Sequence, residues 1–250
     1  MFTDTHCHLY KEYYQDLSDT INKCVENKIP HFINNGCDDA SNREVLSYLD
    51  KYPGMYAAIG IHPENIDGVK EDDFKYIEEH INDDKVVAIG EIGLDYYWVK
   101  DNKEEQIKLF ERQLQLAEKY NKPVIVHSRD ATDDTINCLK KYKVKGVIHS
   151  FSGSYETAMI YIKMGFLLGI NGVITFKNCK LKDVLLKLDL VNIVLETDSP
   201  YLTPVPYRGE QNNPSHIWDI AKFICEVKKI SMEELSKITE DNVKRIYNIK

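Results

Sequence analysis

Long apolar runs are missing from this chain of 250 residues. A helix that crosses a bilayer needs about 20 consecutive apolar residues, and no segment comes near that length. Residues 1–6 also lack the basic start and the apolar stretch of a signal peptide. We therefore predict a cytoplasmic protein with no leader and no membrane partner.

Paired cysteines are missing as well. The six cysteines include no C-x-x-C pair, so neither a disulfide framework nor a thiolate zinc cluster is indicated. We interpret them as small buried hydrophobic residues. They are Cys7, Cys24, Cys37, Cys138, Cys179 and Cys225.

An excess of positive charge is also missing, because the net charge is −8. Proteins that coat nucleic acid are normally basic, so the composition argues against that class. It does not exclude an enzyme that acts on a phosphodiester. Bound metal ions can supply the positive charge that meets the phosphate, and their acidic ligands enter the count as negative charge.

The chain also lacks the glycine-rich motifs that bind nucleotides, because it has neither a G-x-G-x-x-G nor a P-loop pattern. It has instead a series of short apolar runs, each followed by a segment of helical periodicity. Continuous apolar runs are typical of parallel strands that are buried on both faces. The eight predicted strands are residues 2–8, 31–36, 56–62, 86–92, 123–127, 145–149, 166–170 and 193–198.

This alternation predicts an α/β fold, either a closed barrel or an open doubly wound sheet. Eight strands, with polar residues at most of their C-terminal ends, favour the TIM (β/α)8 barrel, which builds its active site there. An open sheet would gather such residues at one switch point. We predict a single domain over residues 1–250. The clearest predicted helices are residues 103–120, residues 215–229 and a last one from about Met232.

Histidine marks the predicted strand ends. Five of the eight histidines lie there, and packing alone does not explain five, because each buried neutral imidazole would need a partner. The five are His6, His8, His62, His127 and His149, whereas His31, His80 and His216 are interpreted as surface or capping residues.

The first strand carries the H-x-H pair His6 and His8. Residues i and i+2 of a strand point to the same side, so both imidazoles can supply half a metal site at the barrel mouth. Glu91 ends the fourth predicted strand within an apolar run, where a carboxylate needs a partner. Asp198 ends the eighth. Glu196 shares the side of Asp198, but Asp198 is nearer the strand end and is our preferred ligand.

Six side chains thus make up the predicted metal site. Four imidazoles and two carboxylates suit two divalent ions with Glu91 as the shared ligand, and paired ions are a recurring device for phosphodiester cleavage. Mixed nitrogen and oxygen ligands admit Zn, Mn, Ni, Co or Mg. The six are His6, His8, Glu91, His127, His149 and Asp198.

Six segments resemble, in the same order, the successive motifs of TatD-family metal-dependent deoxyribonucleases. The resemblance extends from residue 3 to about residue 214, nearly the whole chain, and the six segments together are highly specific. The segments are residues 5–9 (THCHL), 60–64 (GIHPE), 90–96 (GEIGLDY), 127–131 (HSRDA), 149–153 (HSFSG) and 196–204 (ETDSPYLTP).

The resemblance implies a TIM barrel of the amidohydrolase-like superfamily and metal-dependent hydrolysis of DNA, commonly as a 3′→5′ exonuclease on single strands. It also implies metal ligation by the same six residues and an active-site role for His62. After Arg208 and Gly209 the chain departs from related sequences, because residues 210–214 (EQNNP) replace basic residues and a Glu. We expect this loop to hold a nucleic-acid backbone less strongly.

The predicted mechanism is attack on phosphorus by hydroxide held between the ions. Asp198 would act as general base, Glu91 would bridge the ions, and His62 would contact a phosphoryl oxygen or assist the leaving group. Arg129 and Arg208 would pair with phosphate oxygens. For both arginines the alternative is an ion pair that fixes a loop.

Three aromatic residues, Tyr96, Tyr97 and Trp98, follow the fourth predicted strand. Such rings can stack on a base. Aromatic residues after a strand more often pack against the core, and we interpret these three as packing residues.

Two alternative functions stay open. An amidase, lactonase or deaminase on the same scaffold would need similar metal ligands, because a carbonyl and a phosphoryl group are polarised alike. A non-catalytic binding protein descended from an enzyme would be expected to have lost ligands, and none is missing. The TatD-type motifs favour DNA, or RNA, as substrate, and no obligatory protein partner is indicated.

Overall fold

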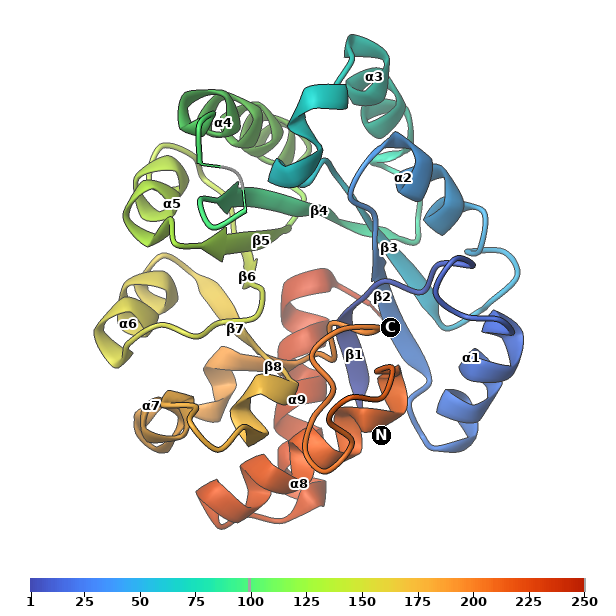
Figure 1. The fold of residues 1–250 in the computed structure, drawn as a ribbon, viewed down its shortest axis with the longest axis vertical. Coiled ribbons are helices and arrows are strands. Elements are labelled where there is room, and N and C mark those ends of the chain that lie inside the picture. The colour runs from blue at the N-terminus through green and yellow to red at the C-terminus, as the bar shows by residue number, and fades with distance from the viewer. Residues whose placement is uncertain (99, 250) are drawn as a thin grey trace. The chain divides into compact units, whose positions relative to one another are not determined.

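The computed structural model describes residues 1–98 and 100–249, in which strands and helices alternate (Figure 1). The strands are β1 (Thr3–Cys7), β2 (His31–Asn35), β3 (Met55–Ile59), β4 (Val86–Asp95), β5 (Val124–Arg129), β6 (Gly146–Ile148), β7 (Phe166–Ile170) and β8 (Ile193–Leu195). The α-helices are α1 (Leu17–Glu26), α2 (Asp39–Leu46), α3 (Glu71–His80), α4 (Lys103–Tyr120), α5 (Thr132–Leu139), α6 (Tyr155–Lys163), α7 (Leu181–Lys187), α8 (Ile217–Lys228) and α9 (Met232–Tyr247). Short 3₁₀ helices are η1 (Pro63–Gly68), η2 (Gly172–Thr175), η3 (Leu190–Asn192) and η4 (Pro214–His216).

The strands follow one another in chain order, from β1 to β8, in one eight-stranded sheet. The pairings of β1 with β2, β3 with β4, β4 with β5, β5 with β6 and β7 with β8 are parallel. Helical segments connect successive strands. Sequential parallel strands with helical crossovers define the (β/α)8, or TIM, barrel. The predicted fold class is therefore confirmed.

The chain forms two compact units. Unit 1 comprises Met1–Asn34 and the described part of Ser150–Lys250, and unit 2 comprises Asn35–His149. The end of the predicted single domain, residue 250, lies outside the described residues, and that domain assignment stays a prediction.

Unit 1 holds β7, β8, β1 and most of β2. Strand β7 pairs with β8, and β1 pairs with β2. Beyond the end of β8, Ser199 forms an isolated parallel bridge with Cys7, so β1 lies next to the continuation of β8. Helix α9, red in Figure 1, packs on β8 and β1.

Unit 2 holds β3 to β6, and helix α4 packs on β4. Two buried glutamines of α4 each bind the backbone N–H and the backbone carbonyl of one residue. Gln113 accepts from the N–H of Ile61 at 2.8 Å and donates to its carbonyl at 3.0 Å. Gln106 does the same at Asp95, at 2.9 Å in both directions. These amide pairs fix the chain after β3 and the end of β4, where polar residues follow.

Several strands end earlier than predicted: β1 at Cys7 and β6 at Ile148, one residue before His8 and His149, and β3 and β8 three residues early. β3 ends at Ile59, because His62 instead caps helix η1, with its Nδ1 atom accepting the N–H of Glu64 at 3.3 Å. β8 ends at Leu195, and Asp198 lies beyond it in left-handed backbone, with φ 57°. The predictions that His62 and Asp198 end strands are therefore wrong.

Strand β4 is longer than predicted and runs to Asp95, so Glu91 lies in its middle rather than at its end. The predicted strand ended at Ile92, just before Gly93. Gly93 has φ 148°, and a Cβ there would lie 1.9 Å from the carbonyl oxygen of His127. This glycine therefore permits close approach of β5 and does not end the strand.

The predicted helices agree with the structure in their main bounds. Helix α4 begins and ends as predicted. The segment expected to be helical from residue 215 begins with η4, where the Oδ1 of Asn213 accepts the N–H of Ser215 at 3.0 Å. Ser231 caps α9 by accepting the N–H of Glu234 at 3.1 Å.

Two further expectations concern cysteines and membranes. Cys37 and Cys179 are partly exposed, so the buried interpretation is wrong for these two and confirmed for the other four. Over the described ranges, no helix combines the length and the apolar character that a membrane span requires. The cytoplasmic location stays a prediction.

Candidate metal centre

In unit 1, His6, His8 and Asp198 bring three potential ligand atoms together. The Nε2 atoms of His6 and His8 are 3.1 Å apart, and each lies 3.6 Å from the Oδ1 of Asp198. Two ligand atoms about 2.1 Å from one ion lie about 3.0–3.4 Å apart at octahedral or tetrahedral angles. The spacing of the two imidazole nitrogens lies in this range, their spacings to Asp198 lie just above it, and the mixed donor set suits one divalent ion.

Backbone hydrogen bonds of unit 1 hold these three residues next to one another. The N–H of Asp198 donates to the carbonyl of His6 at 2.9 Å, and the N–H of His8 donates to the carbonyl of Ser199 at 2.7 Å. The left-handed φ of Asp198 costs of order 1 kcal/mol in a residue with a side chain, although Asp tolerates it better than most residues. Strain of this kind is common where a turn must present a functional group.

Two buried side chains support this group. The hydroxyl of Tyr10 lies 3.1 Å from the Nδ1 of His8 and can orient the ring. Asp4 accepts from the N–H of His6 at 3.3 Å and from the N–H and hydroxyl of Thr197 at 2.9 and 2.5 Å. Burial raises the pKa of Asp4 to about 7, although these hydrogen bonds oppose the rise. Neither Tyr10 nor Asp4 was predicted from the sequence.

A second support lies on the loop before α8. The Nδ2 of Asn212, a buried residue, donates to the carbonyl of Thr197 at 2.9 Å and to that of Tyr201 at 2.5 Å. The Nδ1 of His216 lies 2.7 Å from the Oδ1 of Asn212. His216 therefore helps to fix the segment that contains Asp198, which goes beyond the predicted surface or capping role.

In unit 2, the carboxylate of Glu91 faces three imidazoles. Its Oε1 lies 3.0 Å from the Nδ1 of His127, 3.7 Å from the Nε2 of His62 and 3.9 Å from the Nε2 of His149. Glu91, His62 and His149 are buried, and Glu91, His62 and His127 form a group that could hold an ion. A buried carboxylate needs a cation or several donors, and this arrangement fits a divalent ion.

Asp95 completes the group in unit 2. Its Oδ2 lies 2.9 Å from the Nε2 of His127, on the opposite side of the ring from Glu91. Imidazoles that bind metal commonly donate their other N–H to a carboxylate, which fixes the tautomer and the ring. The sequence analysis assigned no role to Asp95. Its even spacing from Glu91 was the available signal, because both point to one side of a strand that reaches residue 95.

The pH dependence of metal binding follows from His127. Burial lowers its pKa, but the hydrogen bonds with Asp95 and Glu91 outweigh burial and raise the pKa to about 9. An ion at Nδ1 must displace a proton, so metal affinity is expected to rise with pH up to about 9 and then to level off.

Calorimetry at pH 7 in two buffers of different ionisation enthalpy should show protons released as metal binds. Asp95→Asn removes the anionic partner of Nε2 and is expected to diminish both the pH dependence and the proton release. Equal affinities at pH 6.5 and 8.5, without proton release, would contradict this assignment.

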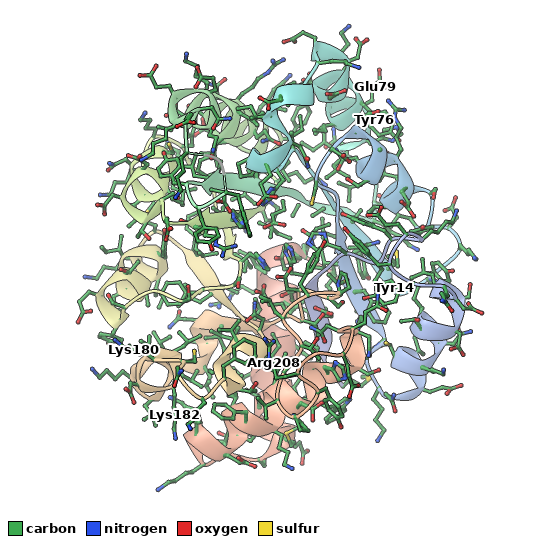
Figure 2. The ribbon with its side chains drawn as sticks, viewed as in Figure 1. Tyr14, Tyr76, Glu79, Lys180, Lys182 and Arg208 are labelled. Carbon is green, nitrogen blue, oxygen red and sulfur yellow. The ribbon has the colours of Figure 1, made fainter. Side chains whose placement is uncertain are left out.

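The two predicted substrate-binding arginines are both exposed. The guanidinium of Arg129 lies 3.9 Å from the ring centroid of Tyr97, and within the described ranges no ion pair joins it to Asp130 or Asp133. Arg208, labelled in Figure 2, donates to the carbonyl of Thr203 at 3.0 Å and lies 4.0 Å from the ring centroid of Phe176. Its contacts fix the loop through a carbonyl rather than an ion pair. Phosphate binding by either arginine stays a prediction.

Comparison with known proteins adds the family. The family model described as TatD related DNase matches residues 3–248. The chain belongs to the TatD family. It is 40% identical to YabD of Bacillus subtilis (strain 168), named an uncharacterized metal-dependent hydrolase, with 100% of both chains covered.

Two solved structures of TatD relatives have similar folds. The crystal structure of YjjV, a TatD homologue from Escherichia coli K12, has a TM-score of 0.93 at 29% identity and covers 100% of this chain and 98% of its own. The TatD-family hydrolase from Entamoeba histolytica has a TM-score of 0.88 at 25% identity and covers 98% of this chain and 97% of its own. The resemblance drawn from the motifs is confirmed. This TatD chain is a metal-dependent hydrolase, and its groups of imidazoles and carboxylates could hold divalent metal.

Proposed function

We propose that this TatD hydrolase cleaves phosphodiester bonds of nucleic acid, acting on single-stranded DNA from the 3′ end. The observation that carries the proposal is that unit 1 and unit 2 each hold imidazoles and a carboxylate at spacings that fit a divalent ion. Two ions per chain are a recurring device for phosphodiester cleavage. The family model's description as a DNase supports the same reaction class.

The chemistry divides between the ions and the side chains. Divalent ions, when bound, lower the pKa of water and stabilise negative charge on phosphoryl oxygens. The side chain of Asp198 is 14% exposed, so water can reach it, and its carboxylate accepts the proton of the attacking water. Glu91 as a ligand shared by two ions stays a prediction, which the Glu91 variants below test.

The tautomer of His62 supports a role as hydrogen-bond donor. Its Nδ1 accepts the N–H of Glu64 at 3.3 Å, so the neutral ring carries its proton on Nε2. A metal ligand at Nε2 would need the opposite tautomer. We therefore assign His62 to donate from Nε2 to a phosphoryl oxygen or to the leaving oxygen, although it lies in the same group as Glu91 and His127.

A substrate panel tests the proposal. Metal-reconstituted protein should hydrolyse end-labelled nucleic acid, remove a 3′ label first from single-stranded DNA and lose the activity in EDTA. Amides, lactones and nucleosides should show little turnover. If the protein were inert toward every DNA and RNA but active on an amide or lactone, the metal-site assignment would stand and the proposed nuclease activity would be wrong.

A further inference from the structure

Two large aromatic side chains next to the Glu91 group lie open to solvent. Tyr97 is 45% exposed and Trp98 is 64% exposed, whereas Tyr96 is 7% exposed. The packing interpretation is therefore wrong for Tyr97 and Trp98 and right for Tyr96. Aromatic side chains bury large areas when they pack, so two adjacent exposed rings give up that stabilisation and indicate another use.

The backbone under these rings is fixed from both sides. The Oδ1 of Asp95 accepts the N–H groups of Tyr97 and Trp98, each at 2.8 Å. The N–H of Tyr96 donates to the carbonyl of Arg129 at 2.9 Å, and the hydroxyl of Tyr96 donates to Asp134 at 2.8 Å. The rings are therefore presented by an ordered turn, which lowers the entropy lost when a ligand stacks on them.

The same turn is tied to the candidate metal ligands. Asp95 holds the turn with Oδ1 and the Nε2 of His127 with Oδ2. A single carboxylate thus links the exposed rings to an imidazole that faces Glu91. A group stacked on these rings would be held at a fixed place relative to that imidazole.

Arg129 adds positive charge beside the rings. It lies two residues after His127 on β5, so the two side chains share one side of the strand. Its guanidinium is 3.9 Å from the ring centroid of Tyr97 and 5.4 Å from that of Trp98. The two rings meet edge to face, with centroids 4.8 Å apart. Planar rings beside a fork of N–H donors match a ligand with a flat base and an anionic phosphate.

We propose that Tyr97, Trp98 and Arg129 form a nucleotide-binding platform, on which one unpaired base stacks while the guanidinium pairs with its phosphate. This inference rests on the proposed function and names the substrate element that the site recognises. Aromatic side chains stack on bases that are unstacked from their neighbours, which single strands offer along their length, so the platform accounts for a preference for single strands. It predicts little base selectivity, because every base has a π face.

Tryptophan fluorescence tests the platform without hydrolysis. The chain has two tryptophans. The ring centroid of Trp218 lies 4.9 Å from that of Phe2, and its Nε1 donates to the carbonyl of Asn27 at 2.6 Å. Trp218→Phe leaves Trp98 as the only tryptophan, whose fluorescence can be excited selectively over that of the tyrosines. A single-stranded phosphorothioate oligonucleotide, which resists cleavage, should quench this fluorescence. The same oligonucleotide with abasic 3′ nucleotides should quench it little. Equal quenching by both would overturn base stacking.

Kinetics separate the two parts of the platform. Trp98→Ala is expected to raise KM for single-stranded DNA about 10-fold or more, since base stacking on aromatic rings is typically worth a factor of this size. It should leave KM for an abasic substrate and the metal content unchanged. Arg129→Gln is expected to raise KM for both substrates. Leu186→Ala on α7 is the matched control, because Leu186 is 51% exposed and lies in unit 1.

The outcomes distinguish this inference from the proposed nuclease. An unchanged KM for Trp98→Ala on a substrate that the parent hydrolyses would contradict the platform but not the proposed nuclease activity. Quenching by a base-bearing oligonucleotide, in a protein that hydrolyses no nucleic acid, would support the platform and contradict the proposed nuclease activity.

Discussion

Asp198→Asn is expected to lower turnover by about 100-fold or more, because general-base contributions are typically ~10²–10⁴-fold. Most of the bound metal should remain, since asparagine keeps one oxygen toward the Nε2 atoms of His6 and His8. The fold should also remain, because asparagine tolerates the left-handed φ of 57° at this residue. Hydrolysis rate and metal content are to be measured on one preparation.

Asp130→Asn is the matched control for this variant. Asp130 is also an acid in left-handed backbone, with φ 53°, and it is exposed. The same substitution there should change turnover by no more than about twofold, as is usual for an exposed residue. If Asp198→Asn retained a rate close to that of the parent, Asp198 would not be the general base.

Glu91→Ala is expected to leave no measurable turnover. Its Oε1 faces the Nδ1 of His127 and the Nε2 atoms of His62 and His149, so the substitution removes the anion on which these imidazoles converge. If Glu91 is the shared ligand, metal content should fall from about two ions per chain to fewer than one.

Two further variants make the Glu91 result interpretable. Glu91→Gln keeps the volume of this buried side chain, so a loss of activity in both variants is not explained by a cavity. His80→Ala should be nearly silent, because His80 ends α3 and its described side-chain contacts are with Asp83 and the ring of Tyr76 rather than with a candidate metal ligand. His216→Ala is a poorer control, since His216 bonds to Asn212. Near-normal turnover of Glu91→Ala would show that the site assignment is wrong.

The sequence predicted most of the fold and the kinds of residue, histidine and acidic residues, that form the candidate metal centre. Continuous apolar runs indicated buried parallel strands, and the H-x-H spacing placed His6 and His8 on one side of β1. The structure confirms that the two imidazoles face each other. These features depend on local periodicity, which a single sequence displays directly.

Residues whose partners lie far along the chain were missed. Asp4 lies on the same side of β1 as His6, but its burial is explained by Thr197, which is 193 residues away. Asp95 depends on Gln106 and on His127, which is 32 residues away. A local pattern shows that an acid is present, but not whether the fold supplies the donors that allow its burial.

The turn after β4 was misread for a related reason. An apolar strand followed by three aromatic residues is the usual pattern of continued packing. The side-chain bonds of Asp95 to the backbone of Tyr97 and Trp98 turn the chain instead. Only Tyr96, which bonds to Asp134, reaches the interior. Exposure at this point depends on one carboxylate, which composition does not reveal.

The most direct measurement of the central claim is a metal titration of metal-free protein, followed by the release of nucleotides from 3′-labelled single-stranded DNA. The account predicts no release without metal, a rate that rises as divalent ions bind and levels off near two ions per chain, and complete loss in excess EDTA. Full activity in EDTA, or no release from any nucleic acid at any metal loading, would contradict it.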